Sequence, residues 1–206
     1  MGKGRIESFS DGVFAVAITV LVFNLLPIGS GKLSYLTLAR SWPQYAAYAV
    51  GFLTIGIMWL NHHTLLAHVV RVDRVTLLLN LFLLMIVVVM PWPTALVADH
   101  LRDAGSAGQV AAVTYGIGSI LISVGFGLLW TYLSGRQRSL AGLSRRTRWR
   151  AGLRFSAGMA GYVAGTLVAA FASAAVALAI YALVAIYYAF EHLPAPVRED
   201  AESPAA

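Results

Sequence analysis

Cysteine is absent from the 206-residue sequence, and charged residues make up only 12% of it. Without cysteine, the chain cannot form disulfides, thiolate metal sites or a cysteine nucleophile. A soluble protein is typically about one quarter charged and about half apolar, whereas this chain is 59% hydrophobic. The composition excludes an ordinary soluble domain and indicates an all-α integral membrane protein.

Signatures of intramembrane catalysis are also missing. The sequence contains no GxSxG and no HExxH motif, and no paired carboxylates fall inside its apolar segments. We therefore expect no enzyme activity, no cofactor and no metal site.

Long uncharged runs set the predicted helices. They cover 12–31, 41–70, 75–98, 104–135 and 155–190. A spanning helix needs about 20 residues, so each of the first four runs supplies one. The last run is too long for one span and predicts two helices with a turn around Phe171–Ala174, although one kinked, tilted span stays open. The six expected helices lie near 8–27, 43–66, 74–97, 107–133, 149–170 and 174–192.

Basic residues predict the orientation. Of the 15 Lys and Arg residues, only Lys32, Arg40 and Arg102 fall on one side of a six-helix layout. Because basic loops stay in the cytoplasm, both termini are predicted to be cytoplasmic. The basic charge sits in short loops between apolar runs, which indicates contact with membrane lipid and not with nucleic acid. Residues 1–193 form the expected transmembrane domain, and the polar, proline-rich tail 194–206 is predicted to be disordered.

The first helix carries an acidic residue, Asp11, in or beside the membrane. Such residues usually face protein and have partners; alternatively, Ser10 or Asp11 caps the helix N-terminus. The predicted topology brings Asn61, His62, His63 and Asn80 to a similar depth, so a hydrogen-bonded cluster between three helices is expected. A metal site is the weaker interpretation, because adjacent histidines point about 100° apart on a helix.

A mostly apolar stripe runs along the same helix. Val16, Thr19, Val20 and Phe23 fall within about 100° of one another, and Gly12 continues the stripe, while Asp11 points about 140° away from Val16. From the residues alone, the stripe could pack against protein, face lipid, meet another subunit or line a pore.

The motif Arg5-x-x-x-Phe9-Ser10-Asp11, followed by Gly12-Val13-Phe14-Ala15-Val16-Ala17-Ile18-Thr19, resembles the signature of the transmembrane protein 175 family of potassium channels, especially its prokaryotic branch. The segment Trp59-x-x-His62-His63 supports the resemblance. Val16 and Val20 stand where bulkier Ile or Leu is common, and Phe23 where Leu is common. A wider or differently shaped constriction is therefore expected.

The resemblance implies a homotetramer in the plasma membrane of a prokaryote, with one six-helix unit per chain and potassium as the permeant ion. The first helix of each subunit would line the pore. Val16, Val20 and Phe23 would form a hydrophobic constriction, with Thr19 as a polar layer that bears on selectivity. The structural supports would be Arg5, Phe9, Ser10 and Asp11, together with the polar residues Asn61, His62, His63 and Asn80.

A proton-coupled secondary transporter is the alternative function, because Asp11 and the histidines could relay protons. Such a transporter would need a central polar site or paired broken helices, and the middles of the later predicted helices show neither. Two further expectations concern packing. Pro91 and Pro93 should kink or end the third helix, and the glycines of the fourth and fifth helices should allow close helix contacts: Gly116, Gly118, Gly125, Gly127, Gly158, Gly161 and Gly165.

Overall fold

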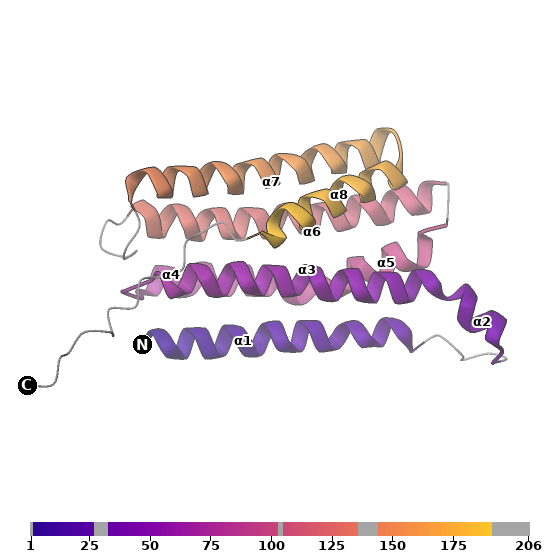
Figure 1. Ribbon diagram of the computed structural model, residues 1–206, viewed down its shortest axis with the longest axis horizontal. Coiled ribbons are helices and arrows are strands. Elements are labelled where there is room, and N and C mark those ends of the chain that lie inside the picture. Colours follow the sequence, from indigo (N-terminus) through magenta and orange to yellow (C-terminus); the bar gives the residue numbers. More distant parts are fainter. Residues whose placement is uncertain (1, 27–32, 103–104, 136–143, 191–206) are drawn as a thin grey trace, which may run out of the picture.

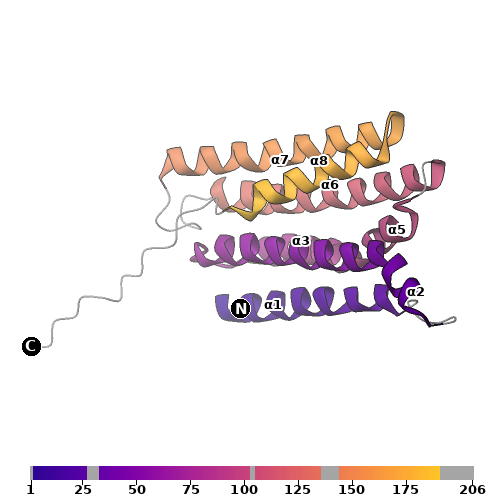
Figure 2. The same cartoon turned by 45° about the vertical axis from the view of Figure 1, so that its right-hand side comes forward.

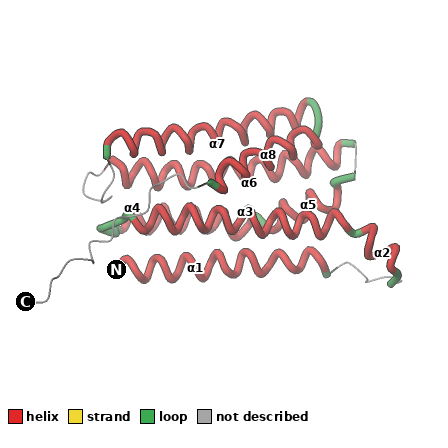
Figure 3. The backbone as a smooth tube through the Cα atoms, in the orientation of Figure 1, coloured by secondary structure: helices red, strands yellow, loops and turns green. Residues whose placement is uncertain are grey.

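The computed structural model describes residues 2–26, 33–102, 105–135 and 144–190. Within these ranges the chain is helical almost throughout, which confirms the all-α class (Figure 3). The helices are α1 (Lys3–Val20), α2 (Tyr35–Arg40), α3 (Trp42–Ala67), α4 (Arg74–Val89), α5 (Pro91–His100), α6 (Ser106–Gly135), α7 (Arg145–Phe171) and α8 (Ala174–Ala189), with the 3-10 segment η1 (Leu21–Leu25) continuing α1.

The first helix starts earlier than predicted. Gly2 is its N-cap, and the Lys3 ammonium group lies 3.7 Å from the Glu7 carboxylate one turn later. Lys3 also donates a 2.7 Å hydrogen bond to the Ala67 carbonyl at the end of α3. These contacts hold the first turn in place. The N-cap interpretation of Ser10 and Asp11 is therefore wrong, because both residues lie about two turns inside the helix.

The later helix boundaries match the predictions within a few residues. The chain turns at Ala172 and Ser173, and the Ser173 side chain caps α8, so the interpretation of 155–190 as one span is wrong. Proline breaks the third predicted helix: α4 ends at Val89 and α5 begins at Pro91, because proline lacks the backbone N–H that would continue the ladder.

The helices form three tiers (Figures 1 and 2). Helix α1 lies at one edge and packs against α3 and α4, which form the middle tier with α5. Helices α6, α7 and α8 form the opposite edge, with α6 contacting both the middle tier and α7. This arrangement leaves one side of α1 uncovered by the other described helices.

Most of the predicted glycine contacts are present. A methyl group added at Gly116 would collide with Thr166 and Tyr181, and one at Gly125 would press on Leu83 at 3.0 Å. At Gly158, the absence of a side chain likewise leaves room for the Tyr188 ring. The prediction is wrong for Gly127, where an added Cβ would meet no atom within 4 Å.

Four described segments are long and apolar enough to cross a membrane: Lys3–Leu25, Trp42–Ala67, Arg74–His100 and Ser106–Gly135. Helix α8 is apolar but shorter, with 16 residues. The predicted disordered tail 194–206 lies outside the described residues, as does the end of the last predicted helix beyond Phe190.

Candidate functional site: the outer face of α1

The stripe predicted on the first helix is the uncovered side of α1. Val16 is 57% exposed and Phe23 is 59% exposed, and Gly12 and Thr19 are exposed between and below them. Val20 is only half-buried and lies at the border of the stripe. The opposite side of α1 is buried against α3 and α4 through Ile6, Phe14, Ala17 and Leu21.

Thr19 is the polar member of this face. Its hydroxyl donates a 2.8 Å hydrogen bond to the Ala15 carbonyl of the previous turn. The donor is therefore used within the helix, while the oxygen keeps lone pairs that can accept from water or contact a cation. An otherwise apolar face thus carries one outward-facing oxygen per chain at this level.

A buried polar cluster fixes the other side of α1. The Asn80 amide nitrogen on α4 donates to the Ser10 hydroxyl at 3.0 Å, and the Asn80 amide oxygen lies 2.7 Å from Nε2 of His62 on α3. All three side chains are at most 1% exposed. Since the amide oxygen can only accept, His62 Nε2 carries a proton in this arrangement. We call Ser10, His62 and Asn80 the three-helix cluster.

Aromatic rings enclose the histidine of this cluster. The centroid of the His62 ring lies 5.3 Å from that of Phe14 and 6.4 Å from that of Phe126. Helices α1, α3, α4 and α6 therefore meet around one buried imidazole. Because an unpaired polar group costs most in such surroundings, the three hydrogen-bonding groups specify how α1 docks.

Asp11 lies outside the three-helix cluster. Its carboxylate is exposed and accepts a 2.8 Å hydrogen bond from Nε1 of Trp59 on α3. Phe9 and Arg5 are also exposed. His63 is exposed as well, and its ring centroid lies 5.7 Å from that of Trp59. The predicted five-residue cluster is thus divided, and only His62 and Asn80 among its members bond to each other.

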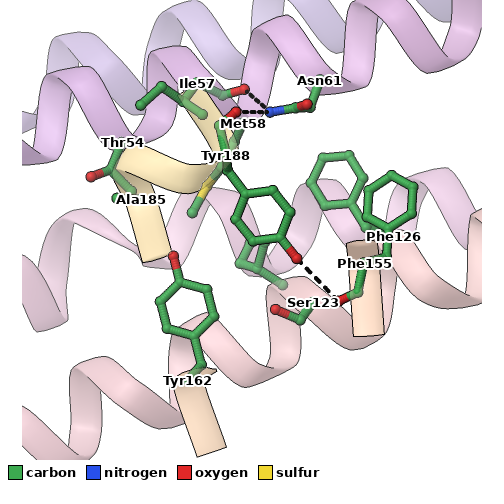
Figure 4. Close-up of a pocket in the computed structure, with 11 residues that line it drawn as sticks. Thr54, Ile57, Met58, Asn61, Ser123, Phe126, Phe155, Tyr162, Ala185 and Tyr188 are labelled. Carbon is green, nitrogen blue, oxygen red and sulfur yellow. Dashed lines mark hydrogen bonds between the residues drawn. The ribbon is translucent and has the colours of Figure 1, made fainter. Parts of the chain in front are cut away.

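Asn61 faces a third environment, shown in Figure 4. Its amide nitrogen donates to the Tyr188 carbonyl on α8 at 3.0 Å and to the Ile57 carbonyl at 2.9 Å. The Tyr188 hydroxyl in turn donates to the Phe155 carbonyl on α7 at 3.1 Å. These residues border an apolar cavity of ≈ 40 Å³, which has room for a water molecule or two and not for a cofactor.

Trp59 is the site residue whose role the sequence analysis missed. It appeared there only as part of a family motif, although an indole donor in the second helix could have been matched to the unpaired carboxylate of Asp11. Metal chemistry gains no support from the described residues, which contain no group of three or more His, Asp or Glu side chains able to hold an ion.

Known proteins are similar to this chain over nearly its whole length. Residues 5–91 match the family model described as endosomal/lysosomal potassium channel TMEM175. A protein of Streptomyces collinus named a potassium channel is 44% identical over 207 residues, covering 97% of both chains. A protein of Chamaesiphon minutus, also named a potassium channel, is 39% identical over 142 residues, covering 67% of this chain and 69% of its own.

The fold is similar to that of a solved channel. The crystal structure of a lysosomal potassium-selective channel TMEM175 homolog from Chamaesiphon minutus matches with a TM-score of 0.78 and 33% identity, covering 91% of this chain and 96% of that one. The uncovered face of α1 and the Arg-Phe-Ser-Asp motif lie within the matched residues 5–91. Because the chain is 44% identical to a relative over 97% of its length and shares the fold, it belongs to the TMEM175 channel family.

Proposed function

We propose that this chain is one subunit of a potassium-selective cation channel, in which four copies surround a central pore lined by α1. One observation carries the proposal: a membrane-length helix presents a mostly apolar face that no described residue of its own chain covers. Relatives named potassium channels support the choice of ion.

The uncovered face fits a pore lining better than a lipid-facing surface. A lipid-facing surface would have no use for the exposed Thr19 hydroxyl or for a buried polar cluster that fixes the rotation of α1. Four copies of the face would place Val16, Val20 and Phe23 in apolar rings, with a ring of Thr19 hydroxyl oxygens among them. An apolar ring hinders ion passage because an ion must shed water there, and such rings can gate by dewetting.

The proposed pore implies a membrane placement. We assign six spans: α1 with η1, α3, α4 with α5, α6, α7 and α8. At about 1.5 Å per residue, the 16 residues of α8 cover about 24 Å, slightly less than the hydrocarbon core of about 30 Å. The arginines at the start of α7 mark the cytoplasmic end. At the other end, the Arg102 guanidinium donates a 3.0 Å hydrogen bond to the backbone carbonyl of Arg40. Both termini are then cytoplasmic, in the plasma membrane of a prokaryote.

Assembly is tested first, by light scattering of the purified protein in detergent. The expected protein mass is four times the protomer mass of 22.1 kDa. A monomer or dimer that conducts potassium would overturn the pore, because one or two copies of α1 cannot enclose it.

The pore lining is tested by single-channel recording. Replacing Val16 with Asn should wet the apolar ring, raise conductance and reduce discrimination against sodium. Thr19→Val keeps the side-chain shape but removes the hydroxyl, so it should weaken selectivity without widening the pore. The matched control is Val163→Asn, the same change at an exposed position on α7, at the far edge of the bundle. If Val16→Asn and Thr19→Val both behave like this control, the face does not line the pore.

Flux in liposomes separates a channel from a proton-coupled transporter. A channel carries potassium down its own gradient and passes single-channel current, whereas a coupled transporter needs a proton gradient or shows saturable exchange. Potassium flux that stops when the proton gradient is collapsed would favour the transporter.

A further inference from the structure

A long groove lies between α6 and α7, far from the uncovered face of α1. Its volume is ≈ 1220 Å³, larger than the roughly 300–1,000 Å³ of a typical small-molecule site. The two helices that line it lie at the edge of the bundle opposite α1 (Figure 1). If α1 surrounds the pore axis, as the proposed function requires, this groove faces the lipid and not a neighbouring subunit.

The two ends of the groove differ in chemistry. At the end where α6 stops and α7 starts, Arg145 and Arg148 of α7 lie across from Thr131 and Ser134 of α6. The Arg148 guanidinium donates to the Ser134 carbonyl at 3.5 Å. Two arginines, a threonine and a serine thus line one mouth. Guanidinium groups suit phosphate recognition because they present several N–H donors in a fixed planar fork.

Further along, the walls become apolar. Leu128 of α6 is 46% exposed, Leu153 of α7 is 50% exposed, and Met159 of α7 is 37% exposed. The serine at position 156 adds little polarity, because its hydroxyl donates to the Gly152 carbonyl at 3.1 Å. The groove therefore changes from basic to apolar along its length. A ligand that fits it would need one polar end and one apolar end.

Glycine keeps the middle of the groove open. A Cβ added at Gly127 would meet no atom within 4 Å, so this glycine does not serve helix packing as the other predicted glycines do. Trp149, 66% exposed, lies beside the two arginines. Tryptophan prefers the level of lipid headgroups, which places the basic mouth at the membrane surface.

The sequence that forms this region is basic. Between Asp103 and Glu191 there is no acidic residue, whereas the first ten residues of α7 include Arg145, Arg146, Arg148, Arg150 and Arg154. An occupant with a negative headgroup and apolar chains matches both ends of the groove. We propose that the α6–α7 groove binds an anionic phospholipid, with its phosphate between Arg145 and Arg148 and an acyl chain over Gly127.

The test uses the purified, assembled protein in neutral detergent, titrated with phosphatidylglycerol and followed by native mass spectrometry. Arg145→Gln with Arg148→Gln should weaken binding about 25-fold, since each basic side chain near an anionic surface contributes a factor of about five. The matched control is Arg146→Gln with Arg150→Gln, which removes the same charge from the same helix outside the groove. It should change the affinity by no more than about twofold. Equal losses in the two pairs would overturn the site, because only the general charge of α7 would then matter.

Two comparison ligands identify the bound molecule. Phosphatidylcholine, which has the chains without the net charge, should bind at least tenfold more weakly than phosphatidylglycerol. Glycerol phosphate, which has the headgroup charge without the chains, should not displace the lipid. Displacement by glycerol phosphate would show a site for free phosphate, and equal binding of the two lipids would show an unspecific apolar surface; either result overturns the proposal.

A filling substitution keeps the test decisive if the arginine pair fails to assemble. Gly127→Phe occupies open space and should leave the oligomer intact while reducing lipid binding at least fivefold. Unchanged binding in this variant would overturn the groove as the lipid site. Because lipid binding is measured without ion flux, a protein that holds the lipid but conducts no potassium would refute the proposed function alone.

Discussion

Replacing Asn80 with Leu should destabilise the chain more than any other single polar-to-apolar change in the first three helices of the predicted layout. Asn80 is 1% exposed and bonds both Ser10 and His62. Leucine has a similar size, so the change removes the hydrogen bonds with little loss of volume. The released groups differ in cost. The Ser10 hydroxyl can turn to a carbonyl of its own helix, whereas the His62 N–H is left facing phenylalanine rings.

The magnitude follows from that asymmetry. A buried donor left without a partner costs about 1–3 kcal/mol, and hydrogen bonds between membrane helices contribute about 0.6 kcal/mol on average and about 1.7 at most. We therefore expect Asn80→Leu to lower the free energy of unfolding by about 1–3 kcal/mol. Unfolding by sodium dodecyl sulfate in mixed micelles, followed by circular dichroism, measures this quantity.

A second substitution separates the mechanism from simple damage. His62→Phe in the Asn80→Leu background removes the orphaned donor and places an apolar ring among apolar rings. Replacing both partners with apolar groups of similar shape can be nearly neutral, so the double variant should recover most of the stability. Losses that simply add, or an Asn80→Leu protein as stable as the parent, would refute the reasoning. A stable Asn80→Leu protein with altered ion selectivity would instead assign the three-helix cluster to conduction.

Four more substitutions test three other contacts. Asp11→Ala should cost only about 0.5–1.5 kcal/mol of stability by thermal unfolding, because the hydrogen bond between Asp11 and Trp59 is exposed. Trp59→Phe removes the same hydrogen bond and should have the same effect. A loss as large as that of Asn80→Leu would contradict this prediction. Gly158→Leu should disrupt the packing of α7 on α8, since even a Cβ there collides with Tyr188; a normal yield of assembled protein in size-exclusion chromatography would count against that contact. Tyr132→Phe removes the 2.5 Å hydrogen bond to the Asp73 carboxylate, which also caps α4, and it should speed hydrogen exchange in the first turn of α4. Unchanged exchange would show that the Asp73 cap does not depend on Tyr132.

The helix positions were predictable because the membrane imposes them. A chain with so little charge must satisfy its backbone within helices, and their lengths follow from the uncharged runs. Pro91 and the turn before Ala174 could be placed for the same local reasons. The start of α1 could not, because Lys3 is fixed by the Ala67 carbonyl 64 residues away, and a local pattern carries no record of that contact.

Tertiary structure alone decided which polar groups meet. Sequence periodicity separates Asp11 from Val16 by angle, and the structure leaves Val16 on the uncovered side of α1. Whether Ser10 or Asp11 would reach Asn80 depends on how α1 is rotated against α4, and the large buried side chains of both helices set that rotation. The same applies to Gly127: its sequence context matches that of the packed glycines, yet it borders a groove in which an added Cβ would meet no atom within 4 Å. Composition and periodicity fix each helix and its faces, whereas the pairing of faces depends on side-chain packing between residues distant in sequence.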